Sequence, residues 1–203
     1  MLFIKNIFKQ RKLRNTGRMF GNSLTGFTLI ELLVTLAIFA LVAAIILASY
    51  PNFTSRLNLE RAAQEMAFSV RQAQSFALAV REFGAGSGIF PGYGIHFDEA
   101  SEKEFILYAD SNNNKVYDAP LELVDRFQIQ TSPKISNLCG GEKSQPPGAC
   151  GLDSLDITFL RPNPTITLKS GLATYSDVEI KIISPSGDVR TISVWSTGQI
   201  AVE

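Results

Sequence analysis

One carboxylate, Glu31, lies inside the run Phe27–Ser49, which contains no other charged residue. A carboxylate at the middle of a membrane costs about 2.5–3.5 kcal/mol on insertion scales, and less near the interface. A carboxylate kept in such a run is therefore expected to have a function and a cationic partner. Because the run contains no Lys or Arg, the cation must come from outside it.

A cut between Gly26 and Phe27 would create that cation. The new amino group of Phe27 would lie only about 6 Å from Glu31 along the axis of its own helix. A neighbouring chain, staggered along the helix axis, would then present its amine to Glu31. The run therefore predicts an assembly contact as well as a membrane anchor.

The length and flanks of the run support an anchor. As a helix, Phe27–Ser49 would be about 35 Å long, enough to cross a hydrocarbon core of about 30 Å. An ordinary secretory signal is shorter and is followed by a small-x-small cleavage site. Residues 1–26 contain six of the 19 basic residues and none of the 19 acidic ones. This basic flank predicts a cytoplasmic N-terminus and an exported remainder with a net charge of −6.

Cys139 and Cys150 flank a Gly- and Pro-rich segment, CGGEKSQPPGAC. An even number of cysteines in an exported domain predicts a disulfide. A pair of free thiols is the alternative, and a metal site is disfavoured because no His or further Cys is near in the sequence.

Four oxygen-bearing side chains have the spacing of a calcium-binding loop, at its positions 1, 3, 5 and 9. They are Asp110, Asn112, Asn114 and Asp118. Lys115 stands where such loops need Gly, and Leu121 replaces the carboxylate of position 12, with Glu122 one place late. A structural calcium site and a plain Asn-rich turn between two strands both remain open, and the two departures favour the turn.

The sequence contains no constellation typical of an enzyme. The one histidine, His96, lies in the strand-like pattern YGIHF, which favours a residue on a sheet face. Motifs for nucleophilic catalysis, zinc hydrolysis and phosphate binding are missing from the sequence. We therefore expect no catalysis. The negative charge of the exported part also argues against nucleic-acid binding.

Helical periodicity resumes after Pro51, a residue that is expected to kink the helix or end it locally. An apolar stripe then runs to Phe83 and Gly84, where we expect the helix to end. Such a stripe packs either on the protein's own core or on neighbouring helices. Its members are Leu59, Ala63, Met66, Val70, Ala73, Ala77 and Val80.

Alternating apolar residues from Tyr93 onward predict short strands. The expected ranges are 93–97, 104–109, 121–129, 155–160, 165–169, 178–183, 189–195 and 199–202. The segment 133–153 is expected to be a loop held by the disulfide. The predicted fold is α+β, with a long helix packed on an antiparallel sheet. Its parts are a basic leader (1–26), a transmembrane helix (27–50), an amphipathic helix (51–84) and a β-rich exported domain (85–203).

The N-terminal residues resemble the signal of type IV pilins and type II secretion pseudopilins. The resemblance rests on a basic leader that ends in Gly26, on Phe27 as the new first residue, and on Glu31 as the fifth after the cut. It implies cleavage between Gly26 and Phe27 by a prepilin peptidase, methylation of the Phe27 amine, and assembly through Glu31. It also implies other pilin subunits and an inner-membrane assembly platform as partners, with the exported domain in the periplasm or outside the cell.

The rest of the chain is similar to GspH/FimT-type minor pseudopilins in its alternation of strands and turns near the C-terminus. That similarity implies a minor subunit near the tip of a secretion pseudopilus or type IV pilus. A major pilin, a DNA-uptake pilin and a single-pass anchor carrying a binding domain are the alternatives. The C-terminal GQIAVE lacks the basic residues expected of a DNA-uptake member.

Overall fold

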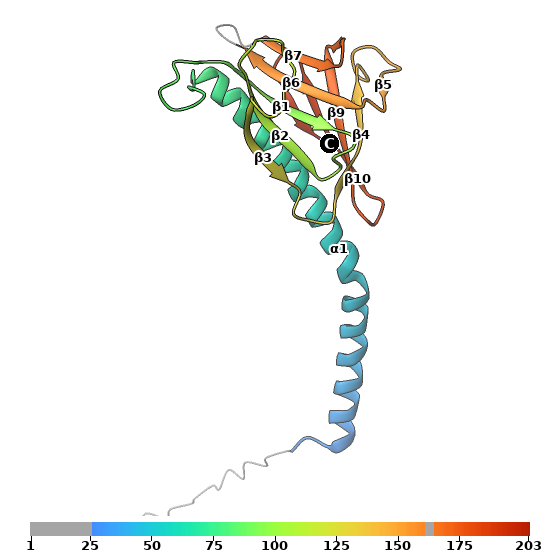
Figure 1. Ribbon diagram of the computed structural model, residues 1–203. Helices are drawn as coiled ribbons and strands as arrows, with labels where there is room; N and C mark the ends of the chain where they lie inside the picture. The colour runs from blue at the N-terminus through green and yellow to red at the C-terminus, as the bar shows by residue number, and fades with distance from the viewer. Residues whose placement is uncertain (1–25, 161–164) are drawn as a thin grey trace, which may run out of the picture. The chain divides into compact units, whose positions relative to one another are not determined.

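The computed structural model describes residues 26–160 and 165–203 (Figure 1). The chain divides into two compact units, Met1–Ile45 and Ile46–Glu203, which we describe separately. Helix α1, Leu29–Leu78, begins in the first unit and ends in the second. The predicted leader, apart from Gly26, and residues 161–164, between two of the predicted strands, lie outside the described residues.

The first part of α1 is apolar on all sides. Its large side chains are exposed, among them Leu29 and Phe39 at 76% and 72%. The helix is long and apolar enough to cross a membrane, with a mean hydropathy of 2.8 in its most apolar window. A helix without a polar face is suited to surroundings that are apolar on every side.

Pro51 does not end the helix. Because proline lacks an N–H group, it removes one i→i−4 hydrogen bond. The residues on both sides of Pro51 nevertheless stay helical, within a helix of 50 residues. Of the two effects expected of Pro51, a kink or a local helix end, the helix end is therefore wrong.

The helix ends before Gly84, at a non-glycine residue in the left-handed region. Val80 has a φ of 54°. Arg81 N donates to the carbonyl of Phe76 at 3.2 Å, and Val80 N donates to that of Ala77 at 3.3 Å. These two bonds form a Schellman cap, which usually has glycine where Val80 stands. Since a β-branched residue is disfavoured there, the sequence placed the helix end too late.

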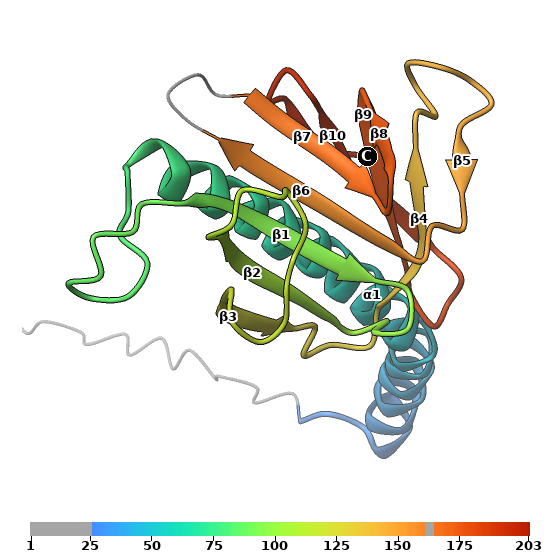
Figure 2. The ribbon, with the colours of Figure 1, turned by 45° about the horizontal axis from the view of Figure 1, so that its top comes forward.

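The strands form two antiparallel sheets (Figure 2), so the α+β fold is confirmed, with two sheets where one was expected. The first sheet has the order β3 (Leu123–Gln128), β2 (Glu104–Asp110), β1 (Gly92–Asp98), β6 (Ser154–Leu160), β7 (Thr165–Ser170) and β8 (Ala173–Tyr175). The second has the order β11 (Ile200–Val202), β10 (Val189–Trp195), β9 (Asp177–Ile183), β4 (Lys134–Gly140) and β5 (Ala149–Cys150).

The predicted loop at 133–153 contains β4 and β5, which corrects the sequence prediction. Strand β4 is internal to the second sheet and pairs with β9 on one side and β5 on the other. Its pairing with β9 shifts register between Ile135 and Asn137. The buried residues Ile135 and Leu138 are consequently three positions apart, and this irregularity breaks the alternation that identifies a strand.

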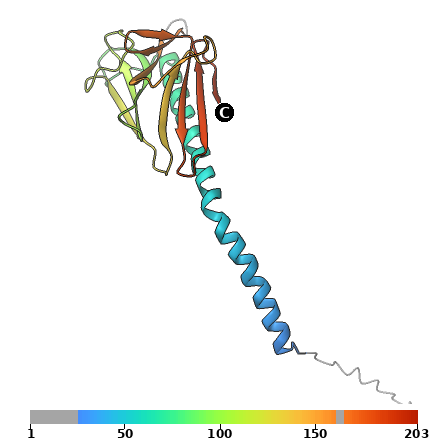
Figure 3. The same ribbon diagram turned by 90° about the vertical axis from the view of Figure 1, so that its right-hand side faces the viewer.

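The second half of α1 covers the core of the second unit (Figure 3). Residues of its stripe from Leu59 to Ala77 are buried with residues of both sheets, so the stripe packs on the protein's own core. Val80, the last predicted member, is 44% exposed and does not belong to this core. Polar contacts fix the helix to the β9–β10 hairpin, including an ion pair from Arg190 Nε to Glu60 Oε2 at 2.9 Å.

Candidate functional site

The first helical turn begins at a threonine cap. Gly26, Phe27 and Thr28 precede the helix, and Thr28 Oγ1 accepts a hydrogen bond from the backbone N–H of Glu31 at 3.3 Å. The carbonyl of Thr28 accepts from Leu32 N at 3.1 Å. Thr28 is therefore the N-cap and Glu31 is the third helical residue, the spacing of a capping box.

This geometry gives Glu31 a defined position beside the predicted cut. In the first turn, the positive end of the helix dipole favours a carboxylate. The predicted new N-terminus, Phe27, lies one residue before the cap. Within residues 26–160 and 165–203, Glu31 forms no ion pair.

The second unit contains the predicted disulfide. Cys139 on β4 and Cys150 on β5 are directly paired residues of the two strands, with their Cα atoms 4.0 Å apart. Cys139 is fully buried, whereas Cys150 is exposed. The alternative of two free thiols is therefore wrong. Glu142 lies close to both sulfurs, but atoms joined in a disulfide are not the thiolate ligands that a metal needs.

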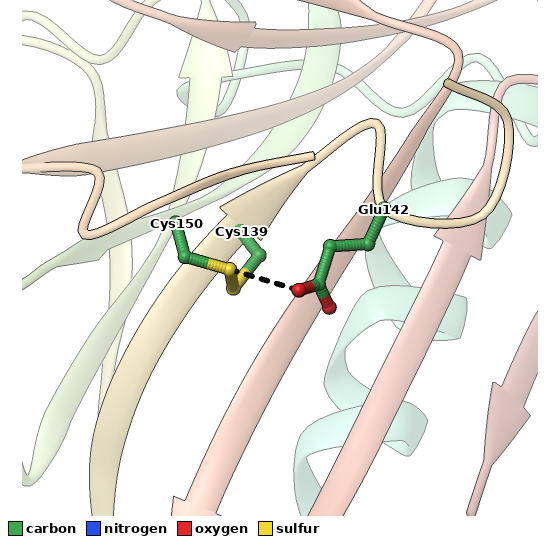
Figure 4. Close-up of side chains that lie close together, drawn as sticks. All are labelled: Cys139, Glu142 and Cys150. Carbon is green, nitrogen blue, oxygen red and sulfur yellow. Dashed lines mark hydrogen bonds between the residues drawn. A yellow bond between two sulfur atoms is a disulfide. The ribbon is translucent and has the colours of Figure 1, made fainter. Parts of the chain in front are cut away.

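Glu142 contacts the disulfide directly (Figure 4). Its Oε1 lies 3.1 Å from Cys150 Sγ. A disulfide sulfur has no proton to donate, so the contact joins a carboxylate oxygen to a sulfur without a hydrogen bond. Lys181 Nζ binds the other carboxylate oxygen, Oε2, at 2.7 Å. Hydrogen bonds with Glu179 and Lys181 lower the pKa of Glu142, so this group is ionised at neutral pH.

A buried aspartate holds the loop between the cysteines. Asp177 on β9 is fully buried and accepts hydrogen bonds from Lys143 N at 3.0 Å and from Ser144 N at 2.9 Å. Ser144 Oγ also donates to it. Burial raises the pKa of Asp177, but the bonds from Ser144 and Lys143 outweigh burial and lower the pKa overall. No motif in the sequence signals this residue, because its partners lie 33 and 34 positions away.

The four predicted calcium-loop residues lie together in a turn after β2. Asp110 accepts from Asn114 N and Lys115 N, both at 3.0 Å. The amides of Asn112 and Asn114 each donate to Asp118 Oδ2 at 2.7 Å. Lys115 takes the left-handed conformation, with a φ of 66°, that glycine supplies in calcium loops. These oxygens already accept hydrogen bonds from donors within the loop, as expected for an Asn-rich turn.

Glu122 supplies further bonds inside the same loop. It is buried, and its carboxylate accepts from Ser111 N at 2.8 Å and from Asp118 N at 3.1 Å. Burial raises the pKa of Asp110, and the nearby charge of Glu122 adds to this effect against the opposing backbone hydrogen bonds. Two buried carboxylates therefore shape the turn.

His96 lies on β1 and binds a buried acid that the sequence did not single out. Its Nδ1 is 2.8 Å from Asp156 Oδ1 on β6, and Asp156 is 1% exposed. The same oxygen accepts a bond from Tyr117 N at 3.2 Å, which connects the 110–118 turn to the first sheet. The register of β1 and β6 pairs His96 with Asp156, and only the folded topology brings them together.

Comparisons with known proteins locate one recognisable segment, at the start of α1. No match to a curated protein or to a solved structure was found. The model of the prokaryotic N-terminal methylation motif matches residues 25–47. This segment includes the predicted cut, the threonine cap and Glu31, and its match supports membrane anchoring by this helix. The motif therefore supports a type IV pilin-like or pseudopilin subunit that a prepilin peptidase processes.

Proposed function

We propose that this chain is a minor subunit of a filament built at a bacterial inner membrane, either a type II secretion pseudopilus or a type IV pilus. The observation that carries the proposal is the methylation motif at residues 25–47, with Glu31 in the first turn of α1 and no other charge in the apolar run Phe27–Ser49. The proposed role is structural, with no catalysis. The N-terminus faces the cytoplasm before processing, and the second unit is exported.

The proposed mechanism begins with cleavage between Gly26 and Phe27, followed by methylation of the Phe27 amine. The new ammonium group then pairs with Glu31 of an adjacent subunit. In a low-dielectric environment this pairing compensates the cost of keeping a carboxylate among apolar side chains. Helix packing between subunits covers the apolar surface that α1 exposes in the first unit.

The resemblance of the C-terminal strands and turns to GspH/FimT-type minor pseudopilins supports the proposal of a minor subunit. The charge of the exported part supports a structural role over DNA uptake. Residues 27–203 carry 13 basic against 19 acidic residues. Phosphate contacts supply most non-specific affinity for DNA, so this balance disfavours such binding.

The mass of the purified protein tests the proposal. We expect a chain that begins at Phe27 and carries one methyl group on its amine when a prepilin peptidase and its methylating activity are present. In a strain without the peptidase the chain should keep residues 1–26. A chain that begins at Met1 in both strains would rule out processing at this site, and with it the filament role.

A further inference from the structure

The two cysteines of the disulfide differ in their exposure to solvent. Cys139 is fully buried on β4, whereas Cys150 is exposed on the short strand β5. Small thiols break disulfides by attack of a thiolate on one sulfur, and accessibility decides which sulfur is attacked. Cys150 Sγ is therefore the sulfur that a thiolate reaches first.

A carboxylate stands next to that sulfur. Glu142 Oε1 is 3.1 Å from Cys150 Sγ (Figure 4), and Lys181 holds the other oxygen of the same carboxylate at 2.7 Å. The position of Glu142 is also fixed by the loop that contains it, because Asp177 binds the two following backbone N–H groups, those of Lys143 and Ser144. The negative charge is thus fixed beside the sulfur that a thiolate would attack.

We propose that Cys150 is the site at which low-molecular-weight thiols modify this protein, and that the Glu142 carboxylate slows their attack. The attacking thiolate would form a mixed disulfide with Cys150 and expel Cys139 as a thiolate. A second thiolate would then attack the small-molecule sulfur of the mixed disulfide and release Cys150. The protein disulfide gains two electrons, and two small thiols are oxidised to their own disulfide.

The charge of Glu142 acts on this step by repulsion. Two unit charges about 4 Å apart in water repel by about 1 kcal/mol, which corresponds to about a fivefold change in rate. Lys181 pairs with Glu142 itself and reduces this repulsion, so about fivefold is its upper limit, whereas the nearby Lys143 pairs with Glu203. Since exposed charges are screened by salt, the effect should shrink as ionic strength rises.

The test measures the rate at which three thiols reduce the full chain in nonionic detergent, for wild type and Glu142→Gln. The probes are 3-mercaptopropionate, 2-mercaptoethanol and cysteamine, whose thiolate forms carry net charges of −2, −1 and 0. The intrinsic reactivity of each thiol cancels in the ratio of variant to wild-type rate. Glu65→Gln, an exposed change on α1, is the control variant.

We expect Glu142→Gln to raise the rate with 2-mercaptoethanol by up to about fivefold at low salt, more with 3-mercaptopropionate and less with cysteamine. Glu65→Gln should leave all three rates unchanged. An equal acceleration for the three thiols would show that the substitution only loosened the loop, and an unchanged rate would show that the carboxylate has no role. Either result overturns the proposed repulsion.

Peptide mapping tests the attacked sulfur separately. After a short reaction and alkylation, cleavage at Lys143 places the two cysteines on different peptides. The thiol adduct should be found on Cys150 and the alkyl group on Cys139. An adduct mainly on Cys139 would contradict the assignment of the attacked sulfur.

Discussion

At the scale of single residues, Asp177 shows how a buried carboxylate stabilises a loop that the hydrophobic core does not hold. It accepts three hydrogen bonds from Lys143 and Ser144, and these bonds are stronger to an ionised acceptor than to a neutral one. Their effect exceeds that of burial, so the pKa of Asp177 in the folded state lies below its ordinary value of 3.8.

Replacing Asp177 by Asn should destabilise the second unit by about 1–3 kcal/mol at neutral pH, because an amide nitrogen then replaces one of the two accepting oxygens and faces a backbone N–H donor. A lowered folded-state pKa means that the carboxylate stabilises the fold above pH 3.8. This contribution is lost as the pH falls through the folded-state pKa. Urea unfolding can be followed by the fluorescence of Trp195. The difference in free energy of unfolding between the two proteins should become progressively smaller as the pH falls below 3.8.

Asp125→Asn, an exposed change on β3, is the matched control and should have little effect at any pH. A constant difference between wild type and Asp177→Asn from neutral to acid pH would show that the carboxylate charge is not what holds the loop.

The sequence predicts residues whose role is local and fails for those whose partners are distant. Glu31 and the two cysteines stand out by composition, since one is a lone charge in an apolar run and the others are the only pair of their type. Asp177 and Asp156 carry no such signal. Their partners are 33 or more positions away, so only the strand pairing shows that they are buried and bonded.

At the scale of elements, the buried face of α1 in the second unit is made largely of alanine, and this brings the helix close to the two sheets. Ala63, Ala67 and Ala73 are all completely buried. Protein interiors are packed without room for extra methylenes, so these positions tolerate no larger side chain.

Ala63→Leu should therefore cost about 1–3 kcal/mol in the free energy of unfolding through overpacking. Arg61→Leu places the same side chain on the exposed face of the same helix and should change stability by less than about 0.5 kcal/mol. Urea unfolding of both variants measures the contrast. Equal stability of the two would mean that the face of α1 that carries Ala63 is not packed on the sheets.

In the turn between β2 and β3, the spacing of the oxygen-bearing side chains fits either a calcium-binding loop or an Asn-rich turn. Its side-chain oxygens already accept hydrogen bonds from the loop, and Lys115 and Leu121 depart from the calcium pattern. We expect the melting temperature of the full chain to be the same with excess calcium and with chelator. A calcium-dependent rise that Asp110→Asn abolishes would instead establish the calcium site at Asp110, Asn112, Asn114 and Asp118.

Element prediction from sequence succeeded where periodicity was regular. The strands that alternate apolar and polar residues were placed correctly to within a few positions. Strand β4 was missed because its register shift separates Ile135 and Leu138 by three positions, and the Pro- and Gly-rich context favoured a loop. The helix end was missed because Val80 supplies a conformation that sequence rules assign to glycine.

At the scale of the whole molecule, the two units differ in composition and in what stabilises them. The first unit holds most of the methylation motif and an apolar helical segment whose one charge is Glu31, whereas the second has its own buried core and disulfide. Substitutions in one unit should therefore leave the stability of the other unchanged. This independence makes it possible to separate a defect in assembly from a defect in folding.

The variant Glu31→Gln should show a defect in assembly without a defect in folding. The amide keeps the size and the helical position of the side chain but removes the charge that pairs with a neighbouring Phe27 amine. We expect unchanged membrane insertion, unchanged urea unfolding of the second unit and a loss of incorporation into sheared filaments of at least tenfold, equivalent to about 1.4 kcal/mol. Quantitative immunoblotting of the filament fraction measures the last of these.

Thr35→Val, another change of a polar side chain in the same helix, should incorporate normally, because it leaves both Glu31 and the threonine cap in place. If Glu31→Gln entered filaments as well as Thr35→Val did, the pairing of Glu31 with a neighbouring amine would be refuted, even though the processing at Gly26 would stand. If both variants failed equally, the apolar surface of the helix would control assembly and the charge would have no specific part in it.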